Sequence, residues 1–358
     1  MKILHLDDVE DQLDLLSDTV ERLKEQEGHE IVITPCKSVE ETKELDLDRF
    51  DVAIVDLNLS GLADPTDEGD RFSKNLIERG FRLPVVIWSA LAADYECEGF
   101  VMRAMAKGDD SAEEVIKYAS KVVRSGLPAL IGRKGRFEEA LTSVLCDSVI
   151  PNIDAWIDRL PDERDQDEAV ASSLTRFLLD HFFDSIDESN EKAFSEEFYL
   201  KAGSPISTGS IVQVSDLTEK DLLVINPSCD LVPRGEEGMK TEKLYLLPII
   251  GADEICESVL TEVKSSRKKD ALKKLMSNRH EVSDSGHWIP QSKLYKGGLV
   301  QFRDIFVLPT NKLDKLHSVG FRVNPRYIGD IQGRFSSFLS RQGQPDVCNI
   351  SEIEKFFR

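Results

Sequence analysis

The sequence lacks the features that mark several large classes of protein. Its six cysteines are scattered without a Cys-x-x-Cys pair, which argues against a disulfide framework. No apolar run approaches the roughly 18 residues that a membrane-spanning helix needs, and no basic and apolar signal precedes the first expected strand at Lys2. Internal repeats and low-complexity tracts are missing too. We therefore expect a cytoplasmic globular protein with reduced thiols.

Common catalytic and nucleic-acid-binding signatures are also missing. The sequence has no P-loop, zinc-protease, serine-hydrolase or protein-kinase motif, and no helix-turn-helix, zinc-finger or RNA-recognition signature. Its net charge of −21 disfavours nucleic acid and anionic membranes as partners, without excluding a local nucleic-acid contact.

The charge is spread unevenly along the 358 residues. Residues 1–125 hold 15 basic and 29 acidic side chains, residues 126–200 hold 7 and 17, and residues 201–358 hold 23 and 20. The last part is therefore electrostatically different, which predicts a domain boundary near residue 200. We expect three parts: a first domain at 1–126, an acidic helical linker or bundle at 127–200, and a C-terminal effector domain at 201–358.

The first 125 residues alternate short apolar runs with amphipathic stretches, a pattern typical of a doubly wound parallel α/β sheet. The expected strands are residues 2–6, 30–34, 51–57, 84–88 and 102–106. The expected helices are residues 10–25, 39–45, 70–78 and 112–123, with a short helical piece near 93–100.

Polar side chains stand at the ends of four of these strands. Asp7 and Asp8 follow the first strand, Asp56 ends the third, Ser89 follows the fourth and Lys107 follows the fifth. Because reactive groups in open α/β sheets gather outside the carboxyl ends of the strands, these residues are expected to meet in one pocket. Three crowded carboxylates need a cation, and such hard oxygen ligands suit Mg²⁺. A carboxylate can also accept a phosphoryl group, whose charge the metal and the lysine would neutralise.

In their order and strand context, these residues resemble the receiver domain of two-component response regulators over residues 1–125. The resemblance implies a five-stranded, flavodoxin-like fold, Mg²⁺ as cofactor, and a sensor histidine kinase or other phosphodonor as partner. It implies that Asp56 is the phosphoacceptor, and it allows a homodimer. The implied metal ligands are Asp7, Asp8, Asp56 and the backbone carbonyl of Asn58. The implied phosphoryl contacts are Ser89 and Lys107.

Four features depart from the pattern of that family. Gly108 follows the lysine where the family usually has proline, and residues 104–106 lack the aromatic switch residue. The loop at 60–70 is unusually long and acidic, and the short segment from 90 to 106 predicts a shortened or irregular fourth helix. Phosphoacceptor chemistry is therefore expected without the usual read-out, and a pseudo-receiver is the alternative.

Residues 127–200 show helical periodicity at 137–146, 152–160 and 168–183, which suits a spacer, a dimerisation bundle or a lid on the last domain. From residue 201 the pattern changes to short β segments bounded by Gly, Pro and Asn. Expected strands are residues 210–214, 222–226, 244–250, 299–308 and 321–323, with a cationic helix at 266–281 and a last helix at 328–339. This predicts an α+β domain around a small sheet or partial barrel.

The most distinctive motif of the last domain is Val-Ile-Asn-Pro-Ser-Cys-Asp-Leu at 224–231. Cys229, next to Asp230, could act as a nucleophile if His280 or His287 supplied a base. The simpler interpretation is a small buried residue in a turn at a strand end, with Asp230 capping backbone donors. With residues 245–248 and 334–343, the motif faintly resembles uncharacterised bacterial domains, some of which accompany mobile-element or antiphage systems.

Three outputs follow for residues 201–358. Phosphorylation at Asp56 could switch a domain that binds a protein partner. The domain could instead be an enzyme that uses Cys229 and Asp230 under control of the receiver. Alternatively, the chain is a non-enzymatic adaptor for a protein or nucleic acid, in which the cationic helix either contacts phosphates or is simply a solvated surface.

Overall fold

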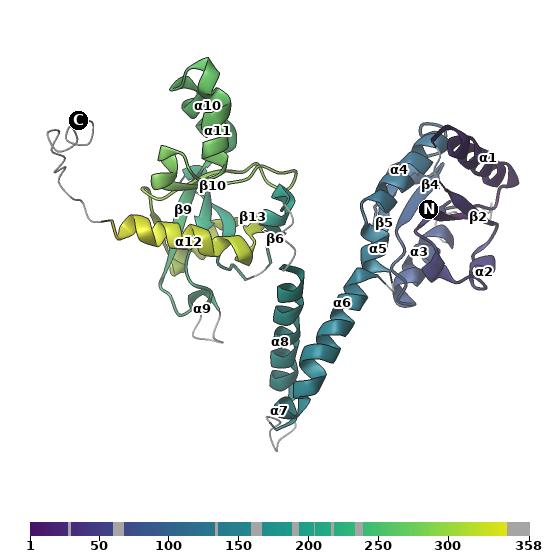
Figure 1. Cartoon of the computed structure of the whole chain (residues 1–358), viewed down its shortest axis with the longest axis horizontal. Helices are drawn as coiled ribbons and strands as arrows, with labels where there is room; N and C mark the ends of the chain where they lie inside the picture. Colours follow the sequence, from purple (N-terminus) through teal and green to yellow (C-terminus); the bar gives the residue numbers. More distant parts are fainter. Residues whose placement is uncertain are drawn as a thin grey trace, which may run out of the picture. The chain divides into compact units, whose positions relative to one another are not determined.

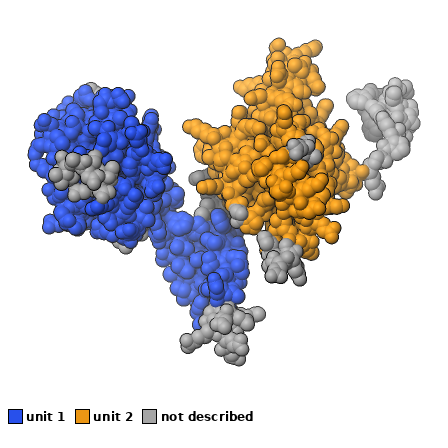
Figure 2. Space-filling model, turned by 180° about the vertical axis from the view of Figure 1, so that it is seen from behind, with its two compact units in different colours: residues 1–190 blue, residues 191–358 orange. Residues whose placement is uncertain are grey.

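The computed structural model divides the chain into two compact units, residues 1–190 and 191–358 (Figure 1, Figure 2). It describes residues 1–27, 30–59, 68–132, 135–158, 167–187, 193–203, 205–215, 218–232 and 239–341. Residues 60–67 of the acidic loop and residues 342–343 of the late motif lie outside this part. Among the described residues, no helix combines the length and the apolar character needed to cross a bilayer.

Unit 1 contains the expected doubly wound parallel sheet, in the strand order β2-β1-β3-β4-β5. Its strands are β1 (Lys2–Leu6), β2 (Val32–Cys36), β3 (Val52–Val55), β4 (Val85–Ser89) and β5 (Val101–Ala106). Helices on both faces cover it: α1 (Glu10–Glu27), α2 (Val39–Thr42), α3 (Glu68–Glu78) and α4 (Ala112–Arg124). Each face has its own core, with Phe72 and Leu76 on one side and Leu16 and Ile116 on the other. The middle strand β3, Val-Ala-Ile-Val, is apolar throughout, as expected for a strand with both faces buried.

The connection from β4 to β5 holds only a 3₁₀ turn, Ala92–Asp94. This confirms the expected loss of a regular fourth helix. The connection is tied to α3 by the Tyr95 hydroxyl, which donates to Asp70 Oδ1 at 2.9 Å.

A helical extension continues from α4 within unit 1. Its members are α5 (Leu127–Ile131), α6 (Arg136–Val144), a π-helical turn Leu145–Val149, α7 (Ile153–Ile157) and α8 (Asp167–Asp187). Gly126, with φ of 81°, lets the chain turn between α4 and α5. Helices α6 and α8 run side by side as a hairpin, in which the rings of Phe137 and Phe182 lie 4.9 Å apart (Figure 1). The ion pair of Arg82 and Glu138, at 2.5 Å, fastens α6 to the sheet domain.

Unit 2 is built on one antiparallel sheet of eight strands, in the order β10-β11-β9-β8-β7-β13-β6, with β12 also paired to β9. The strands are β6 (Tyr199–Lys201), β7 (Ser210–Val214), β8 (Thr218–Val224), β9 (Lys243–Gly251), β10 (Gly286–Ile289), β11 (Gly298–Gln301), β12 (Phe306–Pro309) and β13 (Leu316–Val323). The single strand expected at 299–308 is wrong, because residues 302–305 separate β11 from β12. The Tyr199 hydroxyl on β6 donates to the Pro290 carbonyl just after β10, at 2.5 Å. The two edges of the sheet therefore approach each other, as in a partial barrel.

Helices cover the sheet of unit 2 on different sides. Helix α12 (Pro325–Leu339) buries Ile328 and Ile331 in a core with Phe302. Helices α10 (Ala252–Thr261) and α11 (Lys268–Met276) pack against β10 and β11 through a smaller cluster. Helix α11 is the centre of the cationic helix expected at 266–281, and it is shorter than predicted.

A buried carboxylate locks the middle of this sheet. Asp221 on β8 is 2% exposed and accepts hydrogen bonds from Gln213 Nε2 at 2.7 Å, the Tyr295 hydroxyl at 2.9 Å and Lys296 Nζ at 2.9 Å. Burial by itself would raise the pKa of Asp221, but the three donors outweigh it and lower the pKa. The ionised form therefore stabilises the fold.

We expect Asp221→Ala to lower the free energy of unfolding of unit 2 by about 3 kcal/mol at neutral pH, because it leaves buried donors without an acceptor. Since folding depresses the pKa of Asp221, its contribution is complete above the ordinary pKa of about 4 and is lost as pH falls through the lower folded pKa. The difference in free energy of unfolding between the wild type and Asp221→Ala should therefore shrink in acid. Hydrogen exchange of β8 along a urea series measures it. Glu219→Ala, an exposed change on the same strand, is the control, and equal losses in the two variants would contradict the prediction.

Candidate functional site

Three carboxylates meet at the carboxyl end of the parallel sheet. Asp7 and Asp8 follow β1, and Asp56 follows the neighbouring strand β3. One carboxylate oxygen from each lies within 4.8 Å of the others. Asp7 is fully buried, Asp56 is buried and Asp8 is half-buried. The structure therefore brings together the acidic residues singled out in the sequence.

Lys107 connects two of these carboxylates. Its Nζ lies 2.6 Å from Asp7 Oδ2 and 2.5 Å from Asp56 Oδ2, and 5.7 Å from the centre of the Trp88 ring. Burial disfavours the charged ammonium, but the hydrogen bonds to Asp56 and Asp7 outweigh it and raise the pKa of Lys107. The site therefore holds a permanent internal cation.

The acidic side chains are also oriented by backbone donors. The amide of Val9 donates to Asp7 Oδ1 at 3.0 Å, and the amide of Asn58 donates to Asp56 Oδ1 at 3.3 Å. Burial raises the pKa of Asp7 despite its bonds to Lys107 and Val9. Asp7 and Asp56 thus each have one carboxylate oxygen bonded to a backbone amide and the other to the lysine.

Ser89 and the loop that follows β5 fix the position of Lys107. Ser89 is buried at the end of β4, where its carbonyl accepts from the Lys107 amide at 3.1 Å and its Oγ accepts from the Leu91 amide at 3.3 Å. Asp110 accepts the Ala106 amide on Oδ2 at 3.0 Å and the Trp88 indole on its carbonyl at 3.3 Å. These bonds close a tight turn directly before α4.

Sequence reasoning missed two residues at this site. His5 is 1% exposed, with Nε2 3.9 Å from Asp7 Oδ2, and burial together with the nearby Lys107 lowers its pKa to about 3. It is therefore a neutral neighbour of the acidic cluster. Gly69 starts α3 so close to β3 that a Cβ there would lie 2.1 Å from the Asp56 carbonyl oxygen. His5 could not be recognised from the sequence because it lies within an apolar strand. Nothing in the sequence near Gly69 indicates this close approach.

The speculative cysteine of unit 2 has different surroundings from those expected. Cys229 is exposed on the one-turn helix α9 (Ser228–Leu231), so the interpretation as a buried turn residue is wrong. Its thiol lies 3.7 Å from Asp230 Oδ1, which in turn lies 3.5 Å from Lys240 Nζ.

The two histidines considered as bases make their contacts elsewhere. His280 Nδ1 accepts from the Val282 amide at 3.3 Å, and His287 Nδ1 lies 3.6 Å from Asp330 Oδ2. Within the described part of the chain, no histidine is bonded to Cys229. The geometry therefore gives no support to a cysteine–histidine pair.

Comparison with solved structures finds domains similar to the N-terminal third of this chain. A response regulator receiver protein from Pseudoalteromonas atlantica matches at 18% identity over 35% of this chain and 99% of that chain, with a TM-score of 0.28. A chemotaxis response regulator of Vibrio cholerae matches at 18% over 34% and 97%, with a TM-score of 0.24. Oxidised flavodoxin 2 from Bacillus cereus matches at 15% over 35% and 98%, with a TM-score of 0.24. No protein-family profile and no curated protein sequence matches the chain.

The strand order itself identifies the architecture of the N-terminal domain. A parallel sheet in the order 2-1-3-4-5 with helices on both faces is the arrangement that receiver domains share with flavodoxins. The N-terminal part of this chain therefore has the flavodoxin-like fold that receiver domains also adopt.

We expect Lys107→Met to lower the free energy of unfolding of unit 1 by about 3 kcal/mol in a chelating buffer, because Asp7 and Asp56 would face each other without a cation. Added Mg²⁺ should restore more stability to this variant than to the wild type, since no lysine competes for the carboxylates. Urea denaturation followed by hydrogen exchange of β1 and β3 measures both effects. The matched control is Lys117→Met on the exposed face of α4, where the pair with Glu113 contributes little. Identical responses of the two variants would contradict this view of the site.

Proposed function

We propose that this protein is a response-regulator-like signalling protein in which Asp56 accepts a phosphoryl group. The observation that carries the proposal is Lys107 Nζ held between Asp7 and Asp56 inside a cluster of three carboxylates. A buried lysine between two aspartates at the open edge of a sheet suits a site where negative charge arrives and must be neutralised.

The donor set fits a magnesium ion. Asp7, Asp8 and Asp56 would hold it, with the Asn58 carbonyl as a further oxygen ligand. All of these ligands are hard oxygens, and the carboxylate oxygens of the three aspartates already lie within 4.8 Å of one another. When bound, Mg²⁺ would neutralise charge on the phosphoryl oxygens.

The chemistry of this chain is then a displacement at phosphorus. A carboxylate oxygen of Asp56 attacks the phosphorus of the phosphodonor and forms the acyl phosphate bond, while the bond to the leaving group breaks and its electron pair departs with that group. Lys107 would exchange Asp7 for a phosphoryl oxygen, and the Ser89 hydroxyl would donate to another. A sensor histidine kinase or a small acyl phosphate would serve as donor.

Phosphorylation of Asp56 would alter the rest of the unit through Lys107 and α4. Lys107 stands at the start of the turn that Asp110 closes, and α4 begins immediately after it with a capping box of Ser111 and Glu114. Movement of the lysine toward a phosphoryl group would therefore pull directly on the first turn of α4. This route does not use the aromatic side chain that residues 104–106 lack.

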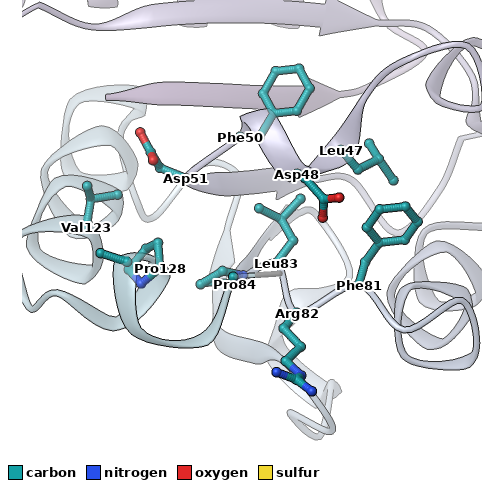
Figure 3. A pocket seen from close by; sticks show the side chains of 12 residues that line it. Leu47, Asp48, Phe50, Asp51, Phe81, Arg82, Leu83, Pro84, Val123 and Pro128 are labelled. Carbon is teal, nitrogen blue, oxygen red and sulfur yellow. The ribbon is translucent and has the colours of Figure 1, made fainter. Parts of the chain in front are cut away.

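The C-terminal end of α4 lies near the start of β4, at the end of the sheet away from the acidic cluster. There Val123 and Pro128 face Leu83 and Pro84 across a hollow of about 150 Å³, whose remaining wall includes Phe50 (Figure 3). Arg82, next to Leu83, forms an ion pair with Glu138 on α6. A shift of α4 at this hollow would therefore displace α5 and α6 together. We propose that the helical extension passes this shift to the C-terminal unit, which acts on a protein partner.

A flavin site is the alternative that the shared fold raises. Flavodoxin-like proteins bind the flavin phosphate at the same edge of the sheet. Here Asp7 and Asp8 follow β1, where a phosphate would need donors and positive charge instead. The acidic cluster therefore favours a metal and a transferable phosphoryl group over a resident flavin.

We expect acetyl phosphate with Mg²⁺ to add one phosphoryl group to the wild type, seen as a mass increase that hydroxylamine removes. Asp56→Asn should lose the label entirely because an amide is not a nucleophile of this kind, while Asp51→Asn at the other end of β3 should keep it. Peptide mapping of the labelled protein locates the acceptor. No label on the wild type, or equal labelling of Asp56→Asn, would identify a pseudo-receiver instead.

Mg²⁺ should change the fluorescence of Trp88, because metal binding would alter the position of the Lys107 ammonium above its ring. The signal should disappear in Trp88→Phe, since Trp156 and Trp288 lie outside this site. Asp8→Asn should weaken Mg²⁺ binding at least about tenfold by removing a charged ligand. A titration that is unaffected by Asp8→Asn would place the ion somewhere else.

A further inference from the structure

Unit 2 contains a second site that the phosphoacceptor does not explain. A hollow of about 400 Å³ opens between the loop before β7, the helix α9 and the strand β13. It is lined by Lys201, Gly203, Pro205, Ile206, Ser207, Ser228, Leu231, Val232 and Arg322. Among these described lining residues, two are cationic and none is acidic. The volume is in the range of small-molecule sites in proteins.

Arg322 is the central feature of this hollow. It is half-buried on β13, and its Nη1 donates to Ser207 Oγ at 3.2 Å. Its Nε is buried and has no hydrogen-bond partner among the described residues. Within that same part of the chain, Arg322 forms no ion pair with a carboxylate. A partly buried guanidinium with an unused donor is costly unless an anion binds it.

Two serine hydroxyls line the hollow together with Arg322. Ser207 Oγ accepts from Arg322, and its hydroxyl hydrogen can go either to Ser210 Oγ at 3.5 Å or to a ligand. Ser228 Oγ lies 2.9 Å from Thr208 Oγ1, whose own hydrogen goes to the Asn226 carbonyl at 2.6 Å. Since the Thr208 hydrogen is used on Asn226, Ser228 donates its own hydrogen to Thr208. Ser228 is exposed, and its hydroxyl would exchange that bond for one to a ligand. An arginine fork with two hydroxyls suits a tetrahedral oxoanion, which accepts hydrogen bonds from several directions.

The turn that carries Ser228 is held rigidly. Asn226 is 1% exposed, its Nδ2 donates to the Lys243 carbonyl at 2.9 Å, and its Oδ1 accepts from the Tyr245 amide at 2.7 Å. The Asn226 side chain thus makes the hydrogen bonds to β9 that a neighbouring strand would make with its backbone, and it fixes the position of Pro227 and Ser228. This explains the motif at 224–231: its buried asparagine positions Ser228, while the neighbouring Cys229 is exposed.

The rest of the lining is apolar. Pro205, Ile206 and Leu231 form part of it, and Val232 is 55% exposed at its rim. An exposed valine beside an apolar wall suits a ligand whose body packs there while its charged end reaches Arg322.

We propose that this hollow binds a phosphorylated small molecule. The phosphate would lie on Arg322, Ser207 and Ser228, and a planar or apolar body would pack on Ile206, Leu231 and Val232. This site is independent of phosphorylation at Asp56. It gives the C-terminal unit a ligand of its own.

Calorimetric titration of the full chain tests the proposal. The buffer contains a chelator, so that Mg²⁺ does not draw phosphate to the acidic cluster of unit 1. The probes are inorganic phosphate, adenosine monophosphate and adenosine. Adenosine monophosphate should bind most tightly, inorganic phosphate more weakly and adenosine not at all. Added salt should weaken binding of both anions.

Variants identify the site. Arg322→Gln should weaken binding of adenosine monophosphate by about tenfold or more and reduce its salt dependence, because it removes the charged donor. Ser228→Ala should weaken it about three- to tenfold with the fold intact, as checked by hydrogen exchange of β8 and β9. Arg303→Gln, an exposed arginine outside the hollow, should change nothing.

Several results would overturn the proposal. These are equal binding of adenosine and its monophosphate, an equal loss in Arg303→Gln, no binding of either anion at millimolar concentration, and unchanged binding in Ser228→Ala. A short oligonucleotide that binds far more tightly than the monophosphate, with a steep salt dependence, would replace the small molecule with a nucleic acid.

Discussion

The bridge from Lys107 to Asp7 and Asp56 is the interaction on which the rest of unit 1 depends. Three carboxylates at the end of a fully buried sheet would repel one another, and the lysine is the cation that lets them stay together. It comes from the last strand, while the acids come from the first and third, so one ammonium joins three separate strands. The same group stands immediately before α4. Stability of the site and the connection to the rest of the unit therefore rest on one side chain.

In unit 2, too, buried polar groups are stabilised by bonded partners. Two buried polar side chains of its sheet, Asp221 and Asn226, are bonded to groups on neighbouring strands and, for Asp221, on the β10–β11 connection. Arg322 is the contrast, since one of its buried nitrogens has no partner among the described residues. The bonded polar groups hold the sheet in register. Ser283 Oγ and His287 Nδ1 are also buried without a hydrogen-bond partner among the described residues, but of these three residues Arg322 is the one that lines the 400 Å³ hollow. The hollow and the unpaired nitrogen together distinguish the proposed binding site from the scaffold.

Much of unit 1 could be predicted because its strands are buried on both faces. Continuous apolar runs such as residues 52–55 leave few alternatives, and the polar residues that follow them must gather at one edge. Unit 2 was harder for a physical reason. Strands β6 and β10 have only three and four residues, too short for periodicity, and α10 follows directly on β9 without a break in composition. Cys229 attracted attention as a reactive residue type, whereas the role of its neighbour Ser228 depends on Arg322, about a hundred residues away in the chain.

The contact between Gly69 and Asp56 has a mechanical consequence. Because no side chain fits between the first turn of α3 and the end of β3, backbone touches backbone there, and no flexible atoms lie between them to absorb a displacement. A change that moves the Asp56 carbonyl would therefore act directly on the first turn of α3. Helix α3 is thus rigidly coupled to Asp56. The hydrogen bond from Tyr95 to Asp70 couples the short β4–β5 connection to α3 as well. Two segments on one side of the sheet would then respond as a single body to events at one carboxylate.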